Sequence, residues 1–310
     1  MTDGARIACI VNPCSAGGKT GKRWPGIEAA VRKHLGEFRA YVTVKPRHAT
    51  ELARQALADG AALIISVGGD GTNNEVLNGL FEDGRPVNPD AAMSVIPGGT
   101  GGDFARFLGF SKDPDNLAAR LAQSKPVPID VGRLTCVDHS GATVSLMFLN
   151  IASFGLGGEV DDRVNRASKA LGGRLSFLWA SLMAVLNYKN RPVHLVIDDV
   201  LDEERVIQQV SVANGQYFGA GMWVAPHAAL DDGLFDIVIQ GDASKAQTLL
   251  RAGDIYKGKH VHHPNTQVLR GRHLTASSKE VTLIDMDGEQ PGRLPVTIEL
   301  IPRALPFLGA

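Results

Sequence analysis

Cysteine is scarce in this sequence, and long apolar runs and a signal peptide are missing. Each of these absences argues against a class of protein. Only three of the 310 residues are cysteines, Cys9, Cys14 and Cys136. An odd number of cysteines without ligand-like spacing argues against a disulfide framework and a cysteine-bound zinc site, and it favours a reducing compartment. No apolar run approaches the roughly 20 residues that a membrane-spanning helix needs. The first residues lack the charged start and apolar core of a signal peptide, so the expected location is cytoplasmic.

A surplus of positive charge is also missing. The 32 lysines and arginines are matched by 33 aspartates and glutamates, so the composition predicts no nucleic-acid partner. The chain is instead rich in glycine, with 35 residues, and in hydrophobic side chains, at 44%. Both features are typical of an α/β protein with tight turns, and the length allows two domains with their own cores.

The most informative stretch runs from Ser66 to Glu75 and reads SVGGDGTNNE. Apolar residues 61–65 before it predict a buried strand, and residues 75–81 predict a helix. A glycine loop between a strand and a helix N-terminus can bind phosphate through backbone N–H groups and the helix dipole. Asp70 lies within this loop, and a carboxylate beside phosphate requires an intermediary such as Mg²⁺, water or a ribose hydroxyl. The loop is neither a dinucleotide fingerprint, which needs a glycine at Asn74, nor a P-loop. An ordinary turn is the plain alternative.

A second candidate loop runs from Asn12 to Thr20. It contains Gly-Lys-Thr like a Walker A loop, but Pro13 stands where the first glycine belongs. Gly21 and Pro25 also interrupt the helix that a P-loop requires. The sequence therefore favours either a different nucleotide loop or an ordinary strand-to-helix loop. In the first case the candidate contacts are Asn12, Ser15 and Lys19.

Strands and helices alternate through the first half of the chain. Predicted strands cover residues 6–11, 41–44, 61–65 and 91–96, and a helix over 51–57 is predicted with Thr50 as its N-cap. A third glycine-rich loop, residues 97–103, ends at Asp103. Connections of this length predict right-handed crossovers and a mostly parallel sheet. The three loops then gather at the carboxyl ends of the strands, in a cleft suited to a polyphosphate and its metal ion.

The pattern changes after residues 125–128, Lys-Pro-Val-Pro, where a domain boundary is expected. Strand-like segments follow with few helices between them, which predicts an antiparallel sandwich or barrel-like second domain. These segments are 129–134, 143–151, 193–197, 206–213, 234–239 and 281–285. One apolar helix is predicted over residues 171–186, with basic residues on both flanks. It either packs on the sheet or faces a membrane.

Two acidic stretches in the second half are candidate sites. Asp231-Asp232-Gly233 offers hard oxygen ligands for Mg²⁺ or Ca²⁺, but the same residues also predict a hairpin turn. Asp285, Asp287 and Glu289 alternate at a strand end. Clustered carboxylates indicate a bound cation or a raised pKa that suits a base, although a solvated strand end explains the pattern equally well. The histidines within residues 260–263 are expected in an exposed loop and are given no role.

Five motifs occur in order along the chain. They are Asn12-Pro-x-Ser-x-Gly17, Gly68-Gly-Asp-Gly-Thr-x-Asn-Glu75, Pro97-x-Gly-Thr-Gly-x-Asp-Phe-Ala-Arg106, Asp231-Asp-Gly233 and Asp287-Gly-Glu289. Together they resemble the diacylglycerol kinase catalytic family, which includes bacterial lipid kinases, sphingosine kinases and ceramide kinases, with NAD kinases as distant relatives. The third motif departs from the family pattern at Gly102, where an asparagine is usual.

The resemblance implies an NAD-kinase-like α/β nucleotide-binding domain with a mostly parallel sheet, formed by residues 1–128 and 296–310. It implies a C-terminal antiparallel β-sandwich for the lipid substrate over residues 129–295. Asp287 would take the proton from the lipid hydroxyl, while Glu289 and Asp70 would organise Mg²⁺ and the charge network. The implied nucleotide contacts are Asn12, Ser15, Lys19, Gly68, Gly69, Asp70, Gly71, Thr72, Asn74, Glu75, Gly99, Thr100 and Asp103. A structural Mg²⁺ site is implied at Asp232 with the carbonyls of Ala229 and Leu234.

The sequence thus predicts an ATP- and Mg²⁺-dependent kinase that transfers the γ-phosphate to a lipid hydroxyl, with a diacylglycerol-type acceptor first. Three alternatives are left open: a ceramide or sphingoid-base kinase, a soluble-substrate kinase similar to NAD kinases, and a lipid-binding protein without catalysis. The expected partners are ATP and a membrane lipid, met transiently at the inner face of the membrane. A homodimer is also left open.

Overall fold

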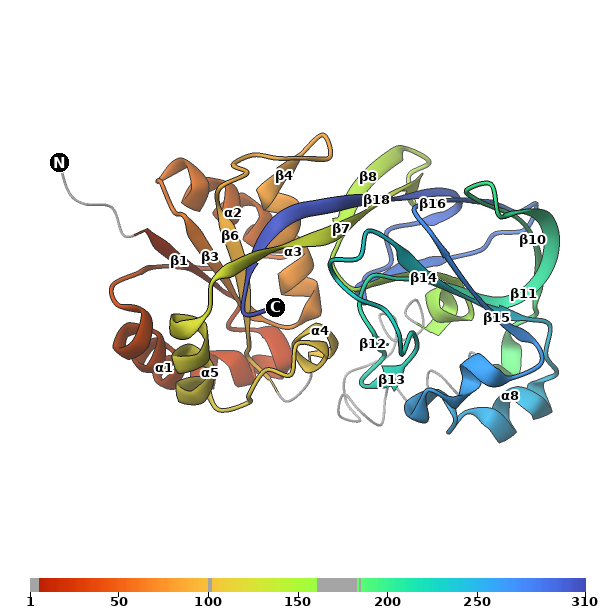
Figure 1. Ribbon diagram of the computed structural model, residues 1–310, viewed down its shortest axis with the longest axis horizontal. Helices are drawn as coiled ribbons and strands as arrows, with labels where there is room; N and C mark the ends of the chain where they lie inside the picture. The colour runs from red at the N-terminus through yellow and green to blue at the C-terminus, as the bar shows by residue number, and fades with distance from the viewer. Residues whose placement is uncertain (1–5, 100–101, 161–182, 184) are drawn as a thin grey trace.

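The computed structural model of the chain describes residues 6–99, 102–160, 183 and 185–310 (Figure 1). Its first half alternates strands and helices. The strands are β1 (Ile7–Val11), β2 (Arg39–Val42), β3 (Leu63–Gly68) and β6 (Ala92–Pro97), with a short hairpin of β4 (Phe81–Glu82) and β5 (Arg85–Pro86). The helices are α1 (Ser15–Leu35), α2 (His48–Ala58), α3 (Asp70–Leu80), α4 (Asp103–Phe107) and α5 (Pro114–Gln123).

Four of these strands form a parallel sheet in the order β2-β1-β3-β6. Helix α1 packs against α5, and α2 packs against α3 (Figure 1). The strands β1, β3 and β6 are almost entirely buried, as expected for a sheet with helices on both faces. The predicted mostly parallel sheet is confirmed. Because parallel strands share one carboxyl edge, the loops after β1, β3 and β6 meet there.

The second half is the antiparallel β-sandwich that the resemblance implies. Its strands are β7 (Pro126–Val137), β8 (Thr143–Phe148), β9 (Ile151–Gly155), β10 (Arg191–Ile197), β11 (Leu201–Ala213), β14 (Phe235–Gly241), β15 (Thr266–Gly271), β16 (His273–Ser277), β17 (Ile284–Met286) and β18 (Arg293–Leu308), with a hairpin of β12 (Tyr217–Phe218) and β13 (Met222–Trp223). The helical elements are α8 (Lys245–Arg251) and the 3₁₀ turns η2 (Ile255–Lys257) and η3 (Lys259–His262). Its core includes the stacked rings of Phe148 and Phe235, 5.7 Å apart.

Strand β18 joins the two halves. It pairs antiparallel with β7 along most of its length, and Phe307 near its end lies beside Met93 of β6 in parallel pairing. Its residues up to Leu300 belong to the sandwich core, whereas Leu305, Phe307 and Leu308 belong to the core of the first half. The predicted domain limits at 128 and 296 stay predictions, and β7 and β18 run across them.

Helix α1 corrects one expectation. The sequence predicts that Gly21 and Pro25 interrupt a helix here, yet the helix continues to Leu35. Gly21 serves close packing, because a Cβ atom there would lie 3.1 Å from the carbonyl oxygen of Pro13. The ring of Pro25 removes one helical hydrogen bond, and the burial of Ile27 on the sheet offsets that loss.

The predicted N-cap of the next helix is also wrong. Helix α2 begins at His48, so Thr50 lies inside it and donates to the carbonyl of Glu75 at 2.8 Å. The carboxylate of Glu75 accepts from the backbone N–H groups of Arg47 and Ala49 at 3.2 and 3.0 Å. A residue of a neighbouring helix therefore supplies the cap that the local sequence assigned to Thr50.

Strands β15 and β16 were not predicted, because their polar and basic residues hide the alternation. The predicted helix over residues 171–186 lies almost wholly outside the described residues. Among the residues that are described, no helix is long and apolar enough to cross a membrane.

Candidate active site

The three glycine loops lie against one another at the carboxyl edge of the parallel sheet. Gly98 of the third loop packs so closely on Thr20 of the first that a Cβ atom would lie 2.1 Å from the threonine Oγ1. Asn12 of the first loop donates from Nδ2 to Oγ1 of Thr72 in the second, at 3.0 Å. The fold therefore assembles one cluster from three segments, as predicted, and glycine is required where they touch.

The first loop turns through three consecutive residues with positive φ, Ala16 (53°), Gly17 (65°) and Gly18 (82°). The Ser15 hydroxyl donates to the carbonyl of Asn12 at 2.9 Å, which holds the turn from inside. Turns of this kind direct successive backbone N–H groups to one side, where an anion can bind. Lys19 follows the turn with its side chain exposed.

Asp70 begins helix α3, directly after the Gly68-Gly69 pair. Its Oδ2 accepts from the backbone N–H of Asp103 at 2.9 Å, and its Oδ1 accepts from that of Phe104 at 3.4 Å. The carboxylate thus stabilises the first turn of α4 and links the second loop to the third. Burial raises the pKa of Asp70 above its ordinary value, against the lowering effect of these two bonds.

Asp103 connects the nucleotide-side loops to the second half of the chain. Its Oδ2 accepts from the backbone N–H of Ala220, in the β12–β13 hairpin, at 2.8 Å. Its Oδ1 is buried without a hydrogen-bond partner in the described part of the chain, and Nε of Arg106 lies 3.7 Å away. Burial, together with the negative charge of Asp70, raises the pKa of Asp103 to about 6.

Asp287 lies at the first position of a two-residue turn. Asp287 and Gly288 have φ values of 52° and 84°, and Met286 and Glu289 exchange backbone hydrogen bonds across them at 2.8 and 3.0 Å. Asp-Gly is the residue pair that such a turn favours, because both central residues need positive φ. The turn brings the side chain of Asp287 back toward the first half of the chain.

The carboxylate of Asp287 is buried and accepts four hydrogen bonds. Asn74 Nδ2 and the backbone N–H of Leu149 donate to Oδ2 at 3.1 and 3.0 Å, while the N–H groups of Asn150 and Ile151 donate to Oδ1, each at 3.1 Å. These donors lower the pKa and hold the group in one orientation, but burial outweighs them and raises the pKa of Asp287 to about 6. The group can therefore exchange a proton near neutral pH.

Glu289 approaches the second glycine loop from the other end of the same turn. A Cβ atom at Gly71 would lie 2.7 Å from Oε1 of Glu289. Gly71 is therefore needed for the close approach of this carboxylate. The predicted residues Asp70, Asp103, Asp287 and Glu289 come from three segments, since the last two share one turn, and they gather at one junction.

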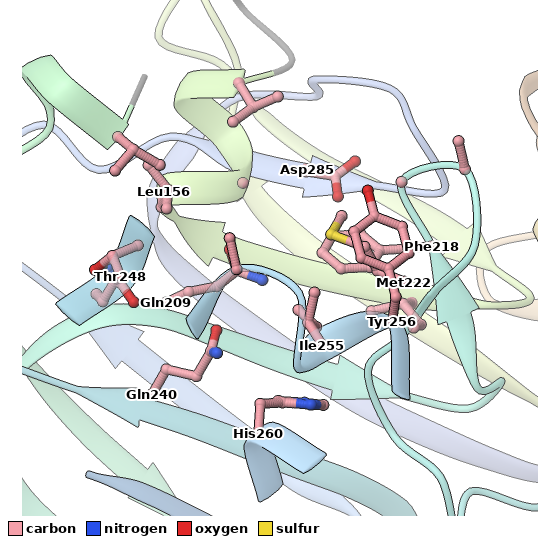
Figure 2. Close-up of a pocket in the computed structure, with 18 of the residues that line it drawn as sticks. Leu156, Gln209, Phe218, Met222, Gln240, Thr248, Ile255, Tyr256, His260 and Asp285 are labelled. Atoms are coloured by element: carbon pink, nitrogen blue, oxygen red, sulfur yellow. The ribbon is translucent and has the colours of Figure 1, made fainter. Parts of the chain in front are cut away.

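A cavity of about 600 Å³ begins at this junction, where Asp70, Asp103 and Asp287 line it. Its other walls come from the sandwich and are mostly apolar. Figure 2 shows Phe218, Met222 and Tyr256 gathered on one side, with the amides of Gln209 and Gln240 across from them. The cavity therefore offers a mostly apolar chamber with a cluster of acids where it meets the glycine loops.

Other predicted contacts lie elsewhere. Glu75 caps α2 with both carboxylate oxygens, and Asn74 binds Asp287 and the carbonyl of Met147 rather than facing the glycine loops. Thr100 lies outside the described residues. The expectation that the histidines of 260–263 share an exposed loop is wrong for His260, which is 2% exposed and contacts the carbonyl of Val224 through Nε2 at 2.9 Å.

Two family models together match nearly the whole chain. The model of the diacylglycerol kinase catalytic domain matches residues 6–134, and that of the YegS C-terminal NAD kinase beta sandwich-like domain matches residues 150–309. The chain belongs to the diacylglycerol kinase family. Membership makes it a kinase, a phosphotransferase with a nucleotide-binding site, and at the level of the family a lipid kinase.

Similar proteins agree with the family. The diacylglycerol kinase of Mycobacterium tuberculosis (strain ATCC 25618 / H37Rv) is 28% identical, over 98% of this chain and 94% of that protein. The diacylglycerol kinase of Bacillus subtilis (strain 168) is 29% identical, over 84% and 81%. A solved structure from Bacillus anthracis str. Sterne, assigned provisionally as a diacylglycerol kinase, has a TM-score of 0.76 at 26% identity and covers 99% and 98%. Yeast NADH kinase complexed with NADH shares the fold, with a TM-score of 0.50, 10% identity and coverage of 99% and 83%.

The acid cluster fits the metal ion that a kinase of this family implies. Within the described ranges, no three His, Cys, Asp or Glu side chains form a ready metal site. Mg²⁺ in kinases is, however, usually held by one or two carboxylates together with substrate phosphates. The buried Oδ1 of Asp103 accepts no hydrogen bond from the described residues and has only a 3.7 Å ion pair with Nε of Arg106, so a cation beside it and Asp70 would be accommodated.

The second implied metal set does not fit as it stands. Asp232 forms an ion pair with Arg270 through Oδ2, and its Oδ1 accepts from the N–H of Leu234 at 3.1 Å. Nε of Arg270 also lies 3.2 Å from the buried carboxylate of Asp236. A guanidinium therefore already supplies the positive charge that a cation at Asp232 and the carbonyls of Ala229 and Leu234 would supply.

Arg23 of α1 positions the third loop, and no motif pointed to it. Its Nη1 donates to the carbonyls of Pro97, Gly98 and Gly99 at 3.2–3.3 Å, and its Nη2 donates to that of Lys112 at 2.6 Å. A glycine-rich segment loses much conformational entropy when it is ordered, so three bonds from one side chain to this loop have a large effect. Only a tertiary contact reveals this role.

Proposed function

We propose that this member of the diacylglycerol kinase family transfers the γ-phosphate of ATP to a primary hydroxyl of a diacylglycerol-type lipid, with Mg²⁺. One observation carries the proposal: the apolar chamber of about 600 Å³ ends at Asp70, Asp103 and Asp287. An apolar cavity with a few convergent polar groups suits a ligand that is mostly hydrocarbon and reacts at one end. An acyl lipid with a free hydroxyl has this chemistry.

The glycine loops would hold the nucleotide. The N-terminus of α3 and the turn at Ala16 and Gly17 would offer backbone N–H groups to phosphate oxygens, while the N–H of Gly18 already donates to the carbonyl of Cys14 at 3.1 Å. The exposed Lys19 would offer a counter-charge. Asp70 and Asp103 would hold Mg²⁺, which would neutralise the negative charge that develops in transfer. Arg23 keeps the third loop in place for this contact.

On the acceptor side, Asp287 would take the hydroxyl proton. Its pKa, raised to about 6, leaves it ionised at neutral pH and still basic enough to accept a proton. Its four hydrogen bonds occupy the lone pairs of a carboxylate, so one donor must yield when the proton arrives. Asn74 is the donor that moves most easily, because its amide is a side chain whereas the other three are backbone groups.

The acceptor is tested by labelling. The purified protein is incubated with γ-³²P-ATP and Mg²⁺ in mixed micelles that contain diacylglycerol, ceramide or a sphingoid base, and separately with NAD; EDTA replaces Mg²⁺ in a parallel set. Label in phosphatidic acid that disappears with EDTA is expected. Label in NAD, or in no lipid of a total extract, would overturn the proposal in favour of a soluble-substrate kinase or a lipid-binding protein without catalysis.

A further inference from the structure

Helix α8 has no buried residue. A capping box fixes its start, since Ser244 and Gln247 bond each other's backbone N–H groups. Short helices in proteins are usually held by burying an apolar face, yet here Leu250 is 86% exposed and Leu249 is 41% exposed. The helix therefore presents leucine side chains to the outside.

Basic residues flank these leucines in the sequence, although Lys245 donates to the carbonyl of Leu186. Between residues 245 and 263 the chain has four lysines or arginines and one acid, Asp254. The acid accepts from Nε2 of His263 at 3.0 Å. Lys257 and Lys259 are exposed, and Tyr256 between α8 and these lysines is 46% exposed. We call the outer surface of residues 245–262 the docking face.

Residues of the docking face also line the chamber. Thr248, Leu249, Ile255 and Tyr256 line the cavity that ends at Asp287, and Figure 2 shows Thr248, Ile255 and Tyr256 at its wall. Helix α8 lies at the outer edge of the sandwich half, at the lower right of Figure 1. A lipid that enters beside α8 would reach the acids through apolar walls.

We propose that the docking face binds the surface of an anionic lipid bilayer and opens the chamber to it. Leu249, Leu250 and Tyr256 would enter the interface, where tyrosine is favoured, while the lysines contact acidic headgroups. A protein partner fits less well, because lysine is depleted from the cores of protein interfaces. The proposal rests on the proposed function for its purpose, but bilayer binding requires neither ATP nor catalysis.

Sedimentation with vesicles tests the docking face directly. Wild-type protein is mixed with phosphatidylcholine vesicles, with or without phosphatidylglycerol, in the absence of nucleotide. The wild type is expected to bind the anionic vesicles. Leu250→Gln should bind them at least about tenfold more weakly, because the leucine would bury apolar area in the interface. Lys257→Gln should weaken binding about fivefold, and only to anionic vesicles. The matched control is Val44→Gln, since Val44 is 82% exposed in the other half of the molecule and should not matter.

The outcomes separate the two proposals. If Leu250→Gln binds anionic vesicles as tightly as the wild type, the proposal for the docking face is wrong. It is also wrong if the wild type forms a dimer that Leu250→Gln abolishes, because the leucine would then contact a second copy of the chain. Kinase activity toward a short-chain diacylglycerol in detergent should be unchanged in Leu250→Gln, whereas activity toward vesicle lipid should fall with binding. Vesicle binding that depends on Leu250, without phosphorylation of any lipid, would support the docking face and reject the proposed function.

Discussion

Asn74 donates a hydrogen bond from Nδ2 to Oδ2 of Asp287 at 3.1 Å, across 213 positions of the chain. The same amide donates to the carbonyl of Met147 at 2.9 Å. Helix α3, which follows the second glycine loop, is thereby fixed to the turn that carries the proposed base. Helix α3 of the first half and the Asp287 turn of the second half therefore belong to one hydrogen-bonded network.

Asp287→Asn is expected to lower kcat by about 10²–10⁴-fold, the usual contribution of a general base, with nucleotide affinity unchanged. An asparagine has one acceptor oxygen, so its NH₂ group would face two of the four donors, and the melting temperature should fall as well. Turnover of labelled ATP, a nucleotide titration and thermal unfolding measure the three quantities. Near-normal turnover would remove Asp287 as the base.

Asn74→Ala is the companion variant. It leaves the base in place but removes one bond that lowers the pKa of Asp287, which burial raises to about 6. The wild-type rate should fall as pH drops through about 6, and this limb should move to higher pH in Asn74→Ala. An unmoved limb would mean that Asp287 does not govern the pH dependence.

Asp103→Asn is expected to stabilise the protein at neutral pH, measured in EDTA. The pKa of Asp103 is raised from 3.8 to about 6, so the folded state binds the proton more tightly than the unfolded chain. Ionisation therefore costs stability, fully above about pH 6 and not at all below the unfolded pKa. The variant should gain up to about 3 kcal/mol in unfolding free energy at pH 8, and less as pH falls toward 4. The amide oxygen can still accept from Ala220, so a loss at pH 8 would contradict the assignment.

Arg23→Gln is expected to raise KM for ATP about tenfold or more, because a glutamine cannot hold three carbonyls and the third loop would lose its order. Arg120→Gln is the matched control. Arg120 donates to the carbonyls of Leu108, Gly109 and Gly309 in the same manner, away from the glycine loops. It should lower the melting temperature and leave KM unchanged. Equal effects of both variants on KM would reduce Arg23 to a general structural role.

Gly71→Ala is expected to lower kcat/KM by about tenfold or more, since its Cβ atom would lie 2.7 Å from Oε1 of Glu289 and displace that carboxylate. Gly26→Ala is the control, because a Cβ atom there meets nothing within 4 Å and alanine is the better helix former. Its melting temperature should be equal to or above that of the wild type. Wild-type kinetics in Gly71→Ala would show that the position of Glu289 is unimportant.

Mg²⁺ added without nucleotide is expected to change the melting temperature of the wild type only a little. Arg270 is already paired with Asp232, so the predicted metal site at Asp232 should bind Mg²⁺ weakly. Arg270→Gln leaves Asp232 and the buried Asp236 without that charge, so Mg²⁺ should raise its melting temperature relative to EDTA. Thermal unfolding in both media decides the point. A strong Mg²⁺ effect in the wild type that disappears in Asp232→Asn would restore the predicted site.

The sequence by itself determined the local features of this protein. Apolar runs that end in glycine loops gave β1, β3 and β6 and the edge where phosphate would bind, because burial and glycine backbone preferences are readable residue by residue. The acids Asp285, Asp287 and Glu289 were likewise recognised as a group at a strand end, but the turn at Asp287 and Gly288 that orients them was not predicted.

The tertiary structure decided which partners each side chain has. Nothing near Glu75 in the sequence indicates that it caps α2. Similarly, nothing near Arg23 indicates that it donates hydrogen bonds to three carbonyls of a distant loop. Likewise Asp232 resembles a metal ligand until Arg270 is found beside it. Hydrogen bonds and ion pairs depend on distance in space, which the order of residues along the chain does not contain. The pKa values of Asp103 and Asp287 follow from burial, which exists only once both halves have packed together.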